Sequence, residues 1–226
     1  ESVDSEVSGN VIDLCPVGAL TSKPYRFSAR SWEMTSHRAI SPHDSLGSNL
    51  IVQSVGGEVK RVLPESNMSV NECWLSDRDR FSYEAVNSTD RLLHPLIRRD
   101  GRMEECSWET ALSVAADNLQ EIVSRDGGDA LGALCTPTAT LEEFYLFQKL
   151  FRGLGSQNID HRLRQQDFRD DLKGPICPGS QLPISEISSL SSAFLIGCNI
   201  RKELPLLALR FRKLSQNNGR IAILNP

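Results

Sequence analysis

Cys15, followed by Pro16, is the residue of this sequence best suited to chemistry. A Cys-Pro pair is the closing element of a common iron–sulfur ligand motif, in which the thiolate binds iron and the proline shapes the turn around the cluster. A half-buried free cysteine before a turn is the other interpretation, and spacing alone favours it. A [4Fe–4S] cluster needs four protein ligands, so Cys15 by itself cannot hold one.

The other cysteines do not complete a site on their own. No two of the six cysteines have Cys-x-x-Cys spacing, which excludes a self-contained zinc or iron–sulfur motif. We expect four of them to be buried or half-buried side chains that behave as small hydrophobic groups. These four are Cys106, Cys135, Cys177 and Cys198.

Composition excludes several classes of protein. The chain has 226 residues, with 25 basic and 29 acidic side chains, so the net charge is −4. This balance argues against a dedicated nucleic-acid binder. The 39% hydrophobic content is that of a globular protein, not of a disordered chain, a collagen or a coiled coil. No apolar run reaches the roughly 18 to 20 residues of a membrane-spanning helix. The polar start without Met leads us to expect a piece of a longer protein.

Residues 34 to 90 have the pattern of a small β-rich domain. Asn49–Val55 and Glu58–Leu63 are rich in branched apolar side chains and are joined by Gly56-Gly57. A two-residue Gly-Gly connection suits the turns that need positive φ, so we predict a β-hairpin here.

From residue 91 onward, helical and strand patterns alternate. Ser107 is predicted to cap a helix that ends at Gly127, and Thr140-x-x-Glu143 is a capping-box pattern that opens a second helix. Pro205 fits the first turn of a third helix. Residues 164–185 are predicted to form a long loop. Buried or short strands are predicted at residues 130–135, 158–161, 193–197 and 221–224. Strand, helix and strand in succession predict a βαβ unit with a parallel sheet.

Several stretches resemble one family. They are Ser8–Phe27, Trp74–Phe81, Asp90–Arg98, Ser107–Ala111 and Gly197–Glu203. They resemble the family of the large iron–sulfur subunit of bacterial NADH:quinone oxidoreductase (respiratory complex I), and the resemblance covers essentially the whole chain. It implies an α/β fold, in which a small β-rich domain precedes an incomplete, parallel-sheet, Rossmann-like domain of the molybdopterin oxidoreductase type.

The resemblance gives Cys15 a role as the last of four ligands to a [4Fe–4S] cluster. Residues 1–33 would be the end of a ferredoxin-like iron–sulfur domain. The other three ligands would lie upstream of this sequence, so we expect this piece to bind no complete cluster by itself.

The second region, residues 34–90, resembles the small domain that opens molybdopterin oxidoreductases, where some relatives hold another [4Fe–4S] cluster. The matching stretch Met34–Asp44 contains no cysteine. Ser76 stands where cluster-bearing relatives have the fourth cysteine, and a serine hydroxyl is not a thiolate at neutral pH. Cys73 lies three residues too early. We therefore predict that this cluster has been lost.

Three further groups of residues could suggest a site, and for each we favour a structural role. His37 and His43 are expected to be loop histidines, and Asp160-His161-Arg162 is expected to form a structural ion pair or a loop hydrogen bond. The third region, residues 91–226, resembles the domain that binds the pterin cofactor in formate dehydrogenases. Its Gly197-Cys198-Asn199 turn continues differently from that of the cofactor binders, so no molybdopterin is expected.

The resemblance implies a fragment of the electron-transfer arm of NADH:quinone oxidoreductase, mainly scaffold and without a complete active site. The expected partners are the flavin- and NADH-binding subunit and the iron–sulfur subunits of the same arm. Nucleic acid and a direct membrane span are not expected. The expected location is peripheral, on the cytoplasmic side of the bacterial inner membrane. The alternatives are a fragment of a catalytic molybdopterin oxidoreductase, such as a formate dehydrogenase, and a purely structural interaction module.

Overall fold

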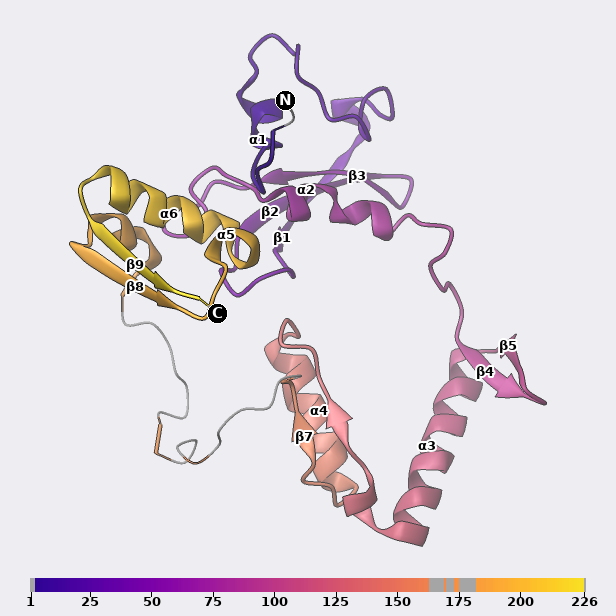
Figure 1. Ribbon diagram of the computed structural model, residues 1–226. Helices are drawn as coiled ribbons and strands as arrows, with labels where there is room; N and C mark the ends of the chain where they lie inside the picture. Colours follow the sequence, from indigo (N-terminus) through magenta and orange to yellow (C-terminus); the bar gives the residue numbers. More distant parts are fainter. Residues whose placement is uncertain (1–2, 163–168, 170–172, 175–181, 226) are drawn as a thin grey trace. The chain divides into compact units, whose positions relative to one another are not determined.

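In the computed structural model, the chain consists of two compact units (Figure 1). The first unit joins residues 1–89 to residues 176–226, and the second comprises residues 90–175. The structure describes residues 3–162, 169, 173–174 and 182–225.

A three-stranded antiparallel sheet forms the centre of the first unit. β1 (Thr35–Ile40), β2 (Asn49–Val55) and β3 (Glu58–Pro64) lie in that order, each hydrogen-bonded to the next. Gly56 and Gly57 connect β2 to β3 with φ angles of 62° and 81°. These positive angles are easily adopted only by glycine, so the predicted hairpin is confirmed with its turn chemistry. β1 was not predicted as a separate strand.

The hydrophobic core lies against this sheet. Leu50 of β2, Val62 of β3, Leu75 and Tyr83 are each at most 8% exposed and pack together. Leu75 is fully buried. This small core anchors the segment that contains Leu75.

Short helical segments surround the sheet. α1 (Asn10–Leu14) and α2 (Asp77–Phe81) have five residues each, and single 3-10 turns occur at Ser31–Glu33 and Ser82–Ala85. Helices this short are not stable in isolation. Their positions therefore depend on tertiary contacts.

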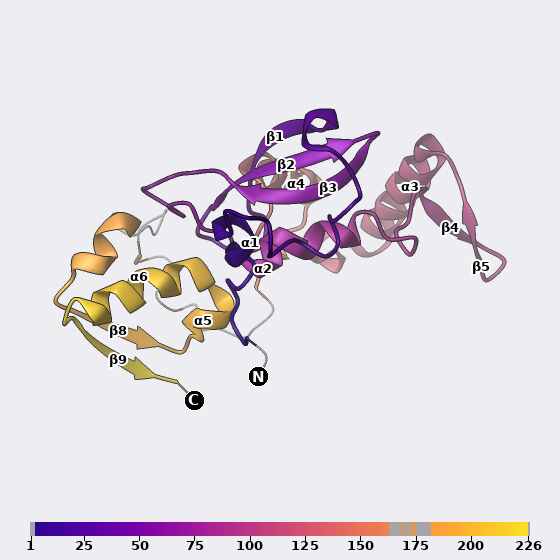
Figure 2. The same ribbon diagram turned by 90° about the horizontal axis from the view of Figure 1, so that it is seen from above.

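A βαβ unit completes the first unit. β8 (Ser192–Ile196) and β9 (Arg220–Leu224) pair in parallel, as predicted. Between them run α5 (Ile200–Glu203) and α6 (Pro205–Gln216), and a 3-10 segment, Ile184–Ser189, precedes β8. α6 lies along one face of the two strands (Figure 2).

The prediction that both strands are buried is wrong for the chain as described. Phe194, Ile196, Ile223 and Leu224 are 59–64% exposed. Parallel sheets require cover on both faces, and α6 covers only one. On the covered side, Leu214 of α6 is completely buried.

Charged groups fasten α6 to the turn before α2. The Arg210 guanidinium is 2.6 Å from a Glu72 carboxylate oxygen and donates to the carbonyls of Met68, at 2.9 Å, and Val70, at 3.3 Å. Lys213 lies 2.7 Å from the other Glu72 oxygen. Burial raises the pKa of Glu72. The Lys213 hydrogen bond and the charges of Arg210 and Lys213 together lower it by more than burial raises it, so the pKa lies below its usual value.

The second unit begins with a hairpin that we did not predict. β4 (Leu96–Arg99) pairs antiparallel with β5 (Arg102–Glu105). Asp100 and Gly101 form the turn, with φ angles of 47° and 80°. An Asp-Gly pair is a recognised hairpin signal. The following helix, α3 (Trp108–Asp126), is the longest of the described chain.

The predicted helix ends of this unit are confirmed. The Ser107 hydroxyl accepts a hydrogen bond from the first turn of α3, and Gly127 follows the helix with a φ of 83°. The Thr140 hydroxyl and the Glu143 carboxylate form the predicted capping box at the start of α4 (Leu141–Gly153).

Two predicted strands are shorter than expected. β6 contains only Ala133–Leu134, and β7 only Ile159–Asp160. They pair in parallel. A 3-10 turn at Gly128–Ala130 occupies the start of the segment predicted as the first of these strands. Most of the predicted loop, residues 164–185, lies outside the described residues. None of the helices in the described part of the chain combines the length and apolar character that crossing a bilayer requires.

We predict that Leu75→Ala lowers the free energy of unfolding of the first unit by about 2–5 kcal/mol, because it removes a fully buried side chain from a small core. Urea unfolding followed by tryptophan fluorescence measures this. Leu92→Ala is the matched control, since Leu92 is 73% exposed and its loss is expected to cost less than about 0.5 kcal/mol. Equal effects of the two substitutions would contradict the assignment of the core.

The ion pairs of Glu72 should make stability depend on pH. The folded-state pKa of Glu72 lies below its ordinary value of 4.5, so its ion pairs stabilise the fold above that pH and are lost as the pH falls through the folded pKa. Glu72→Gln should cost about 1–3 kcal/mol at neutral pH, and the difference from wild type should vanish in acid. Urea unfolding at a series of pH values tests this. Glu121→Gln, at an exposed position of α3, should show no such convergence.

Candidate functional site

Cys15 lies at the carboxyl end of α1. Its backbone N–H donates to the Val11 carbonyl at 3.1 Å, and its own conformation is already extended. Pro16 then carries the chain away from the helix axis. The thiol is half-buried, so it is accessible from outside this chain.

The loop after Cys15 returns its backbone N–H groups to the sulfur. Leu20 N–H donates to Cys15 Sγ at 3.5 Å. This contact lowers the pKa of the thiol most strongly. Desolvation opposes it, and the N–H groups of Val17, Ala19 and Gly18 add to the lowering. The thiolate is the form of cysteine that binds metals, so this loop favours the ligand form of Cys15.

The amino end of α1 is fixed by paired hydrogen bonds. The buried Asn10 side chain donates to the Leu75 carbonyl at 2.7 Å and accepts from the Leu75 N–H at 2.9 Å. One Asp77 carboxylate oxygen accepts from Gly9 N–H at 2.7 Å, and the other accepts from the Ser8 hydroxyl at 2.5 Å. The segment from residue 8 to residue 10 is therefore held by residues just before and within α2.

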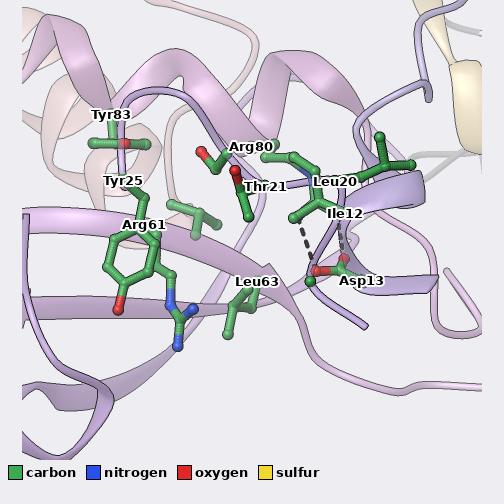
Figure 3. Close-up of a pocket in the computed structure, with 12 residues that line it drawn as sticks. Ile12, Asp13, Leu20, Thr21, Tyr25, Arg61, Leu63, Arg80 and Tyr83 are labelled. Carbon is green, nitrogen blue, oxygen red and sulfur yellow. Dashed lines mark hydrogen bonds and ion pairs between the residues drawn. The ribbon is translucent and has the colours of Figure 1, made fainter. Parts of the chain in front are cut away.

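The carboxyl end of α1 is held by Arg80 of α2. Its guanidinium contacts both Asp13 oxygens, at 2.5 and 3.2 Å, and also the Asn10 side-chain oxygen at 3.2 Å. The Arg80 side chain is only 4% exposed. Figure 3 shows this pair beside Leu20 and Thr21.

A cavity of about 230 Å³ adjoins the loop (Figure 3). Its wall includes Leu20, Tyr83 and two cations, Arg61 and Arg80. The Arg61 guanidinium stacks over the Tyr25 ring at 4.4 Å, and Arg80 is paired as described above. Both cations therefore already have partners inside the chain.

Ser76, at the position expected for a lost cysteine ligand, caps α2. Its hydroxyl accepts from Asp79 N–H at 3.1 Å and donates to Asp79 Oδ2 at 2.7 Å. The Ser41 hydroxyl donates to the other Asp79 oxygen at 2.6 Å. His43 Nε2 is 2.7 Å from the Ser82 hydroxyl and 4.0 Å from Asp79 Oδ1. We call Ser41, His43, Ser76, Asp79 and Ser82 the Asp79 network.

These residues do not fit a [4Fe–4S] cluster. Ser76 and Asp79 are bonded to each other and are at most 2% exposed, so neither has a free position for iron. Cys73 is exposed. Among the described residues, no group of three or more His, Cys, Asp or Glu side chains is arranged to hold a metal ion. His37 is an exposed residue of β1, so the expectation that it lies in a loop is wrong.

Comparison with known families follows the same division of the chain. Residues 91–226, more than half of the chain, match the family described as molybdopterin oxidoreductase. The chain belongs to the molybdopterin oxidoreductase family. Residues 35–84 match "NADH-ubiquinone oxidoreductase NDSU1/NuoG-like, 4Fe-4S domain", and residues 1–21 match "NADH-quinone oxidoreductase subunit 3, ferredoxin-like domain".

Relatives of this chain are named as subunits of NADH-ubiquinone and NADH-quinone oxidoreductases. The chain is 39% identical to the NADH-ubiquinone oxidoreductase 75 kDa subunit of Reclinomonas americana, over 93% of this chain and 31% of the relative. It is 39% identical to the mitochondrial NADH-ubiquinone oxidoreductase 78 kDa subunit of Neurospora crassa, over 94% and 28%. The chain thus spans under a third of the length of these relatives. An NADH-quinone oxidoreductase subunit of Rickettsia felis is 38% identical over 93% of this chain, which confirms the resemblance to the bacterial family.

The fold agrees with this family. Acetylene hydratase from Pelobacter acetylenicus superposes with a TM-score of 0.54 at 15% identity, covering 84% of this chain and 27% of the other. That likeness concerns the fold alone. Together with the parallel pairs β6–β7 and β8–β9, it confirms the predicted α/β class.

The Gly197-Cys198-Asn199 turn and the helix that follows it make structural contacts. The Asn199 side chain caps α5. Arg201 Nε lies 2.6 Å from a Glu6 carboxylate oxygen, and Lys202 pairs with the other oxygen. Hydrogen bonds from Lys202 and then Arg201 lower the pKa of Glu6 to about 2. Sequence reasoning noted that Ile200–Glu203 departs from the cofactor binders but missed this use.

The remaining candidates have structural environments. Asp160 accepts from Arg162 Nε at 3.0 Å and from the His161 backbone N–H at 2.7 Å. The Arg162 bond, followed by the backbone bonds, lowers the pKa of Asp160 to about 2. The expected structural ion pair is confirmed, and Asp160 itself is the last residue of β7. Of the other cysteines, Cys177 lies outside the described residues; Cys106, Cys135 and Cys198 are half-buried, as expected.

We predict that Asp79→Ala destabilises the first unit by about 2–5 kcal/mol, because the buried Ser41 and Ser76 hydroxyls lose their acceptor. Urea unfolding, with hydrogen exchange of residues 35–84 as the local readout, measures the effect. Asp129→Ala, at an exposed position of the second unit, is the control and should lie within about 0.5 kcal/mol of wild type. An unchanged exchange pattern in Asp79→Ala would show that the Asp79 network has no stabilising role.

Proposed function

We propose that this chain is part of the peripheral-arm electron-transfer subunit of an NADH:quinone oxidoreductase, and that Cys15 ligates a [4Fe–4S] cluster. The observation that carries the proposal is the loop of residues 15–20, which directs backbone N–H groups at the Cys15 sulfur. The ferredoxin-like family match over residues 1–21 and the names of the relatives support it.

When bound, such a cluster accepts and releases one electron at a time. The part of this chain is to supply one thiolate and to stabilise negative charge on sulfur through the N–H of Leu20. Fixed N–H dipoles around cluster sulfurs tune the reduction potential. We assign the other three ligands to the preceding part of the longer protein.

The rest of the chain is proposed to be scaffold. Residues 1–33 end the ferredoxin-like domain, residues 34–90 form a small domain without a cluster, and residues 91–226 form an α/β domain without a pterin. The capping role of Ser76 supports the second assignment, and the use of Arg201 and Lys202 in ion pairs with Glu6 supports the third.

The proposed partners are the flavin- and NADH-binding subunit and the iron–sulfur subunits of the same arm. The proposed location is peripheral, on the cytoplasmic side of the bacterial inner membrane. The partner assignment is supported by the names of the relatives, which are subunits of NADH:quinone and NADH:ubiquinone oxidoreductases. A catalytic molybdopterin oxidoreductase is the competing function. The family match over residues 91–226 is the one observation that favours it.

The test is Cys15→Ser in the full-length protein. We expect the loss of one [4Fe–4S] signal in electron paramagnetic resonance (EPR) and of about four iron atoms per protein, with the other clusters retained. Cys73→Ser is the matched control, since Cys73 is exposed and should leave iron and spectra unchanged. Equal iron content in both variants would overturn the ligand assignment, and molybdenum bound by the wild-type protein would favour the competing function.

A further inference from the structure

We propose that Arg80 is a positioning residue for Cys15. Its guanidinium binds Asp13 and Asn10 and so fixes the end of α1 from which the cluster ligand projects. This inference rests on the proposed function of Cys15. Arg80 lies 65 positions after Cys15 in the sequence, and its guanidinium is not itself a metal ligand.

α1 is too short to hold its position unaided. The helix has five residues, and one turn of helix does not persist without outside support. Cys15 is the residue that ends it, and its N–H is bonded to Val11 in the last turn. Any movement of this turn therefore moves the Cys15 sulfur.

Arg80 is the group that restrains the last turn. Asp13 lies two residues before Cys15, and both of its carboxylate oxygens contact the Arg80 guanidinium. The same guanidinium reaches Asn10, one turn earlier on the same helix. A planar guanidinium can contact both partners at once, which fixes the rotation of α1 as well as its position.

The surroundings of Arg80 are built for this contact. A Cβ atom on Gly9 would lie 2.7 Å from the Arg80 side chain, so only glycine leaves room for the arginine stem to cross α1. Arg80 is almost fully buried, which makes an unpaired charge there costly. Asp77, on the same helix, holds Gly9 by its backbone N–H. Residues of α2 thus bind both ends of α1.

Arg80 also lies next to the loop whose backbone faces the Cys15 sulfur. Arg80, Asp13 and Leu20 line the same cavity, where Figure 3 shows them close together. Leu20 provides the N–H that donates to Cys15 Sγ. Arg80 therefore supports the ligand through the helix that precedes it and borders the loop that follows it.

The experiment uses Arg80→Gln in the full-length protein carrying its clusters. We expect occupancy of the Cys15-linked cluster to fall about 10-fold under iron-limiting reconstitution, as is typical when a group that orients a metal ligand is removed. The midpoint potential of any remaining cluster should shift downward, because Asp13 keeps an unpaired negative charge. EPR spectra, redox titration and iron content measure these effects.

Two variants separate positioning from general stability. Arg78→Gln changes a more exposed arginine of the same helix and should leave occupancy, spectrum and potential unchanged. Arg80→Lys keeps the charge without the planar fork, so it should restore the potential while the spectrum stays altered. If Arg80→Gln does not fold, Arg80→Lys decides: wild-type spectrum, occupancy and potential would overturn the inference.

Asp13→Asn adds an independent check. If the two residues act through one contact, the double variant should lose no more occupancy than Arg80→Gln alone; full multiplication of the two effects would overturn the inference. Cys15→Ser keeps the two proposals distinguishable. Loss of the cluster in Cys15→Ser with unchanged Arg80 variants would refute only the positioning role. Retention of the cluster in Cys15→Ser would refute the ligand assignment itself.

Discussion

The first unit depends on the polar side chains of one five-residue helix. In and next to α2, Ser76, Asp77, Asp79 and Arg80 are buried or half-buried, and burying such groups is unfavourable unless each is hydrogen-bonded. Ser76 and Asp79 are bonded to each other, and the remaining partners come from two distant parts of the chain. Asp77 and Arg80 hold the segment around α1, while Asp79 holds the loop before β2 through Ser41. The requirement to satisfy these groups therefore fixes the relative positions of three segments that are distant in sequence.

The same helix ties the Met34–Asp44 stretch to the position of Ser76. A cluster would link the Met34–Asp44 stretch to the position of Ser76 by covalent bonds to iron. In this chain the Asp79 network makes that link with hydrogen bonds: Ser41 and Ser76 both donate to one carboxylate. A buried carboxylate with two hydroxyl donors is a directional connection, and charge-assisted hydrogen bonds are stronger than neutral ones. Ser76 thus serves as the cap of α2 and as part of this connection.

Sequence patterns were most successful where a short local signal fixes the backbone, although the parallel pairing of β8 with β9 was also predicted. The Gly56-Gly57 hairpin and the capping box of α4 each depend on residues a few positions apart. Cys15-Pro16 is equally local, and the family resemblance supplied its role. Burial of β8 and β9 was inferred from composition, which cannot show how many elements cover a strand. The support of the ligand was not predictable, because Arg80 and Asn10 are 70 residues apart and a sequence pattern would place an arginine on the surface.

The βαβ segment also helps to position α1, through the segment that leads into this helix. Glu6 accepts the Asp77 N–H with its backbone carbonyl, while its carboxylate is held by Arg201 and Lys202 at the start of the α/β segment. The chain entering α1 is therefore fixed from two sides, by α2 and by α5. Because these ion pairs are exposed, each contributes little alone, but they act on a segment only four residues before α1. α5 thus helps to orient the segment that leads to Cys15.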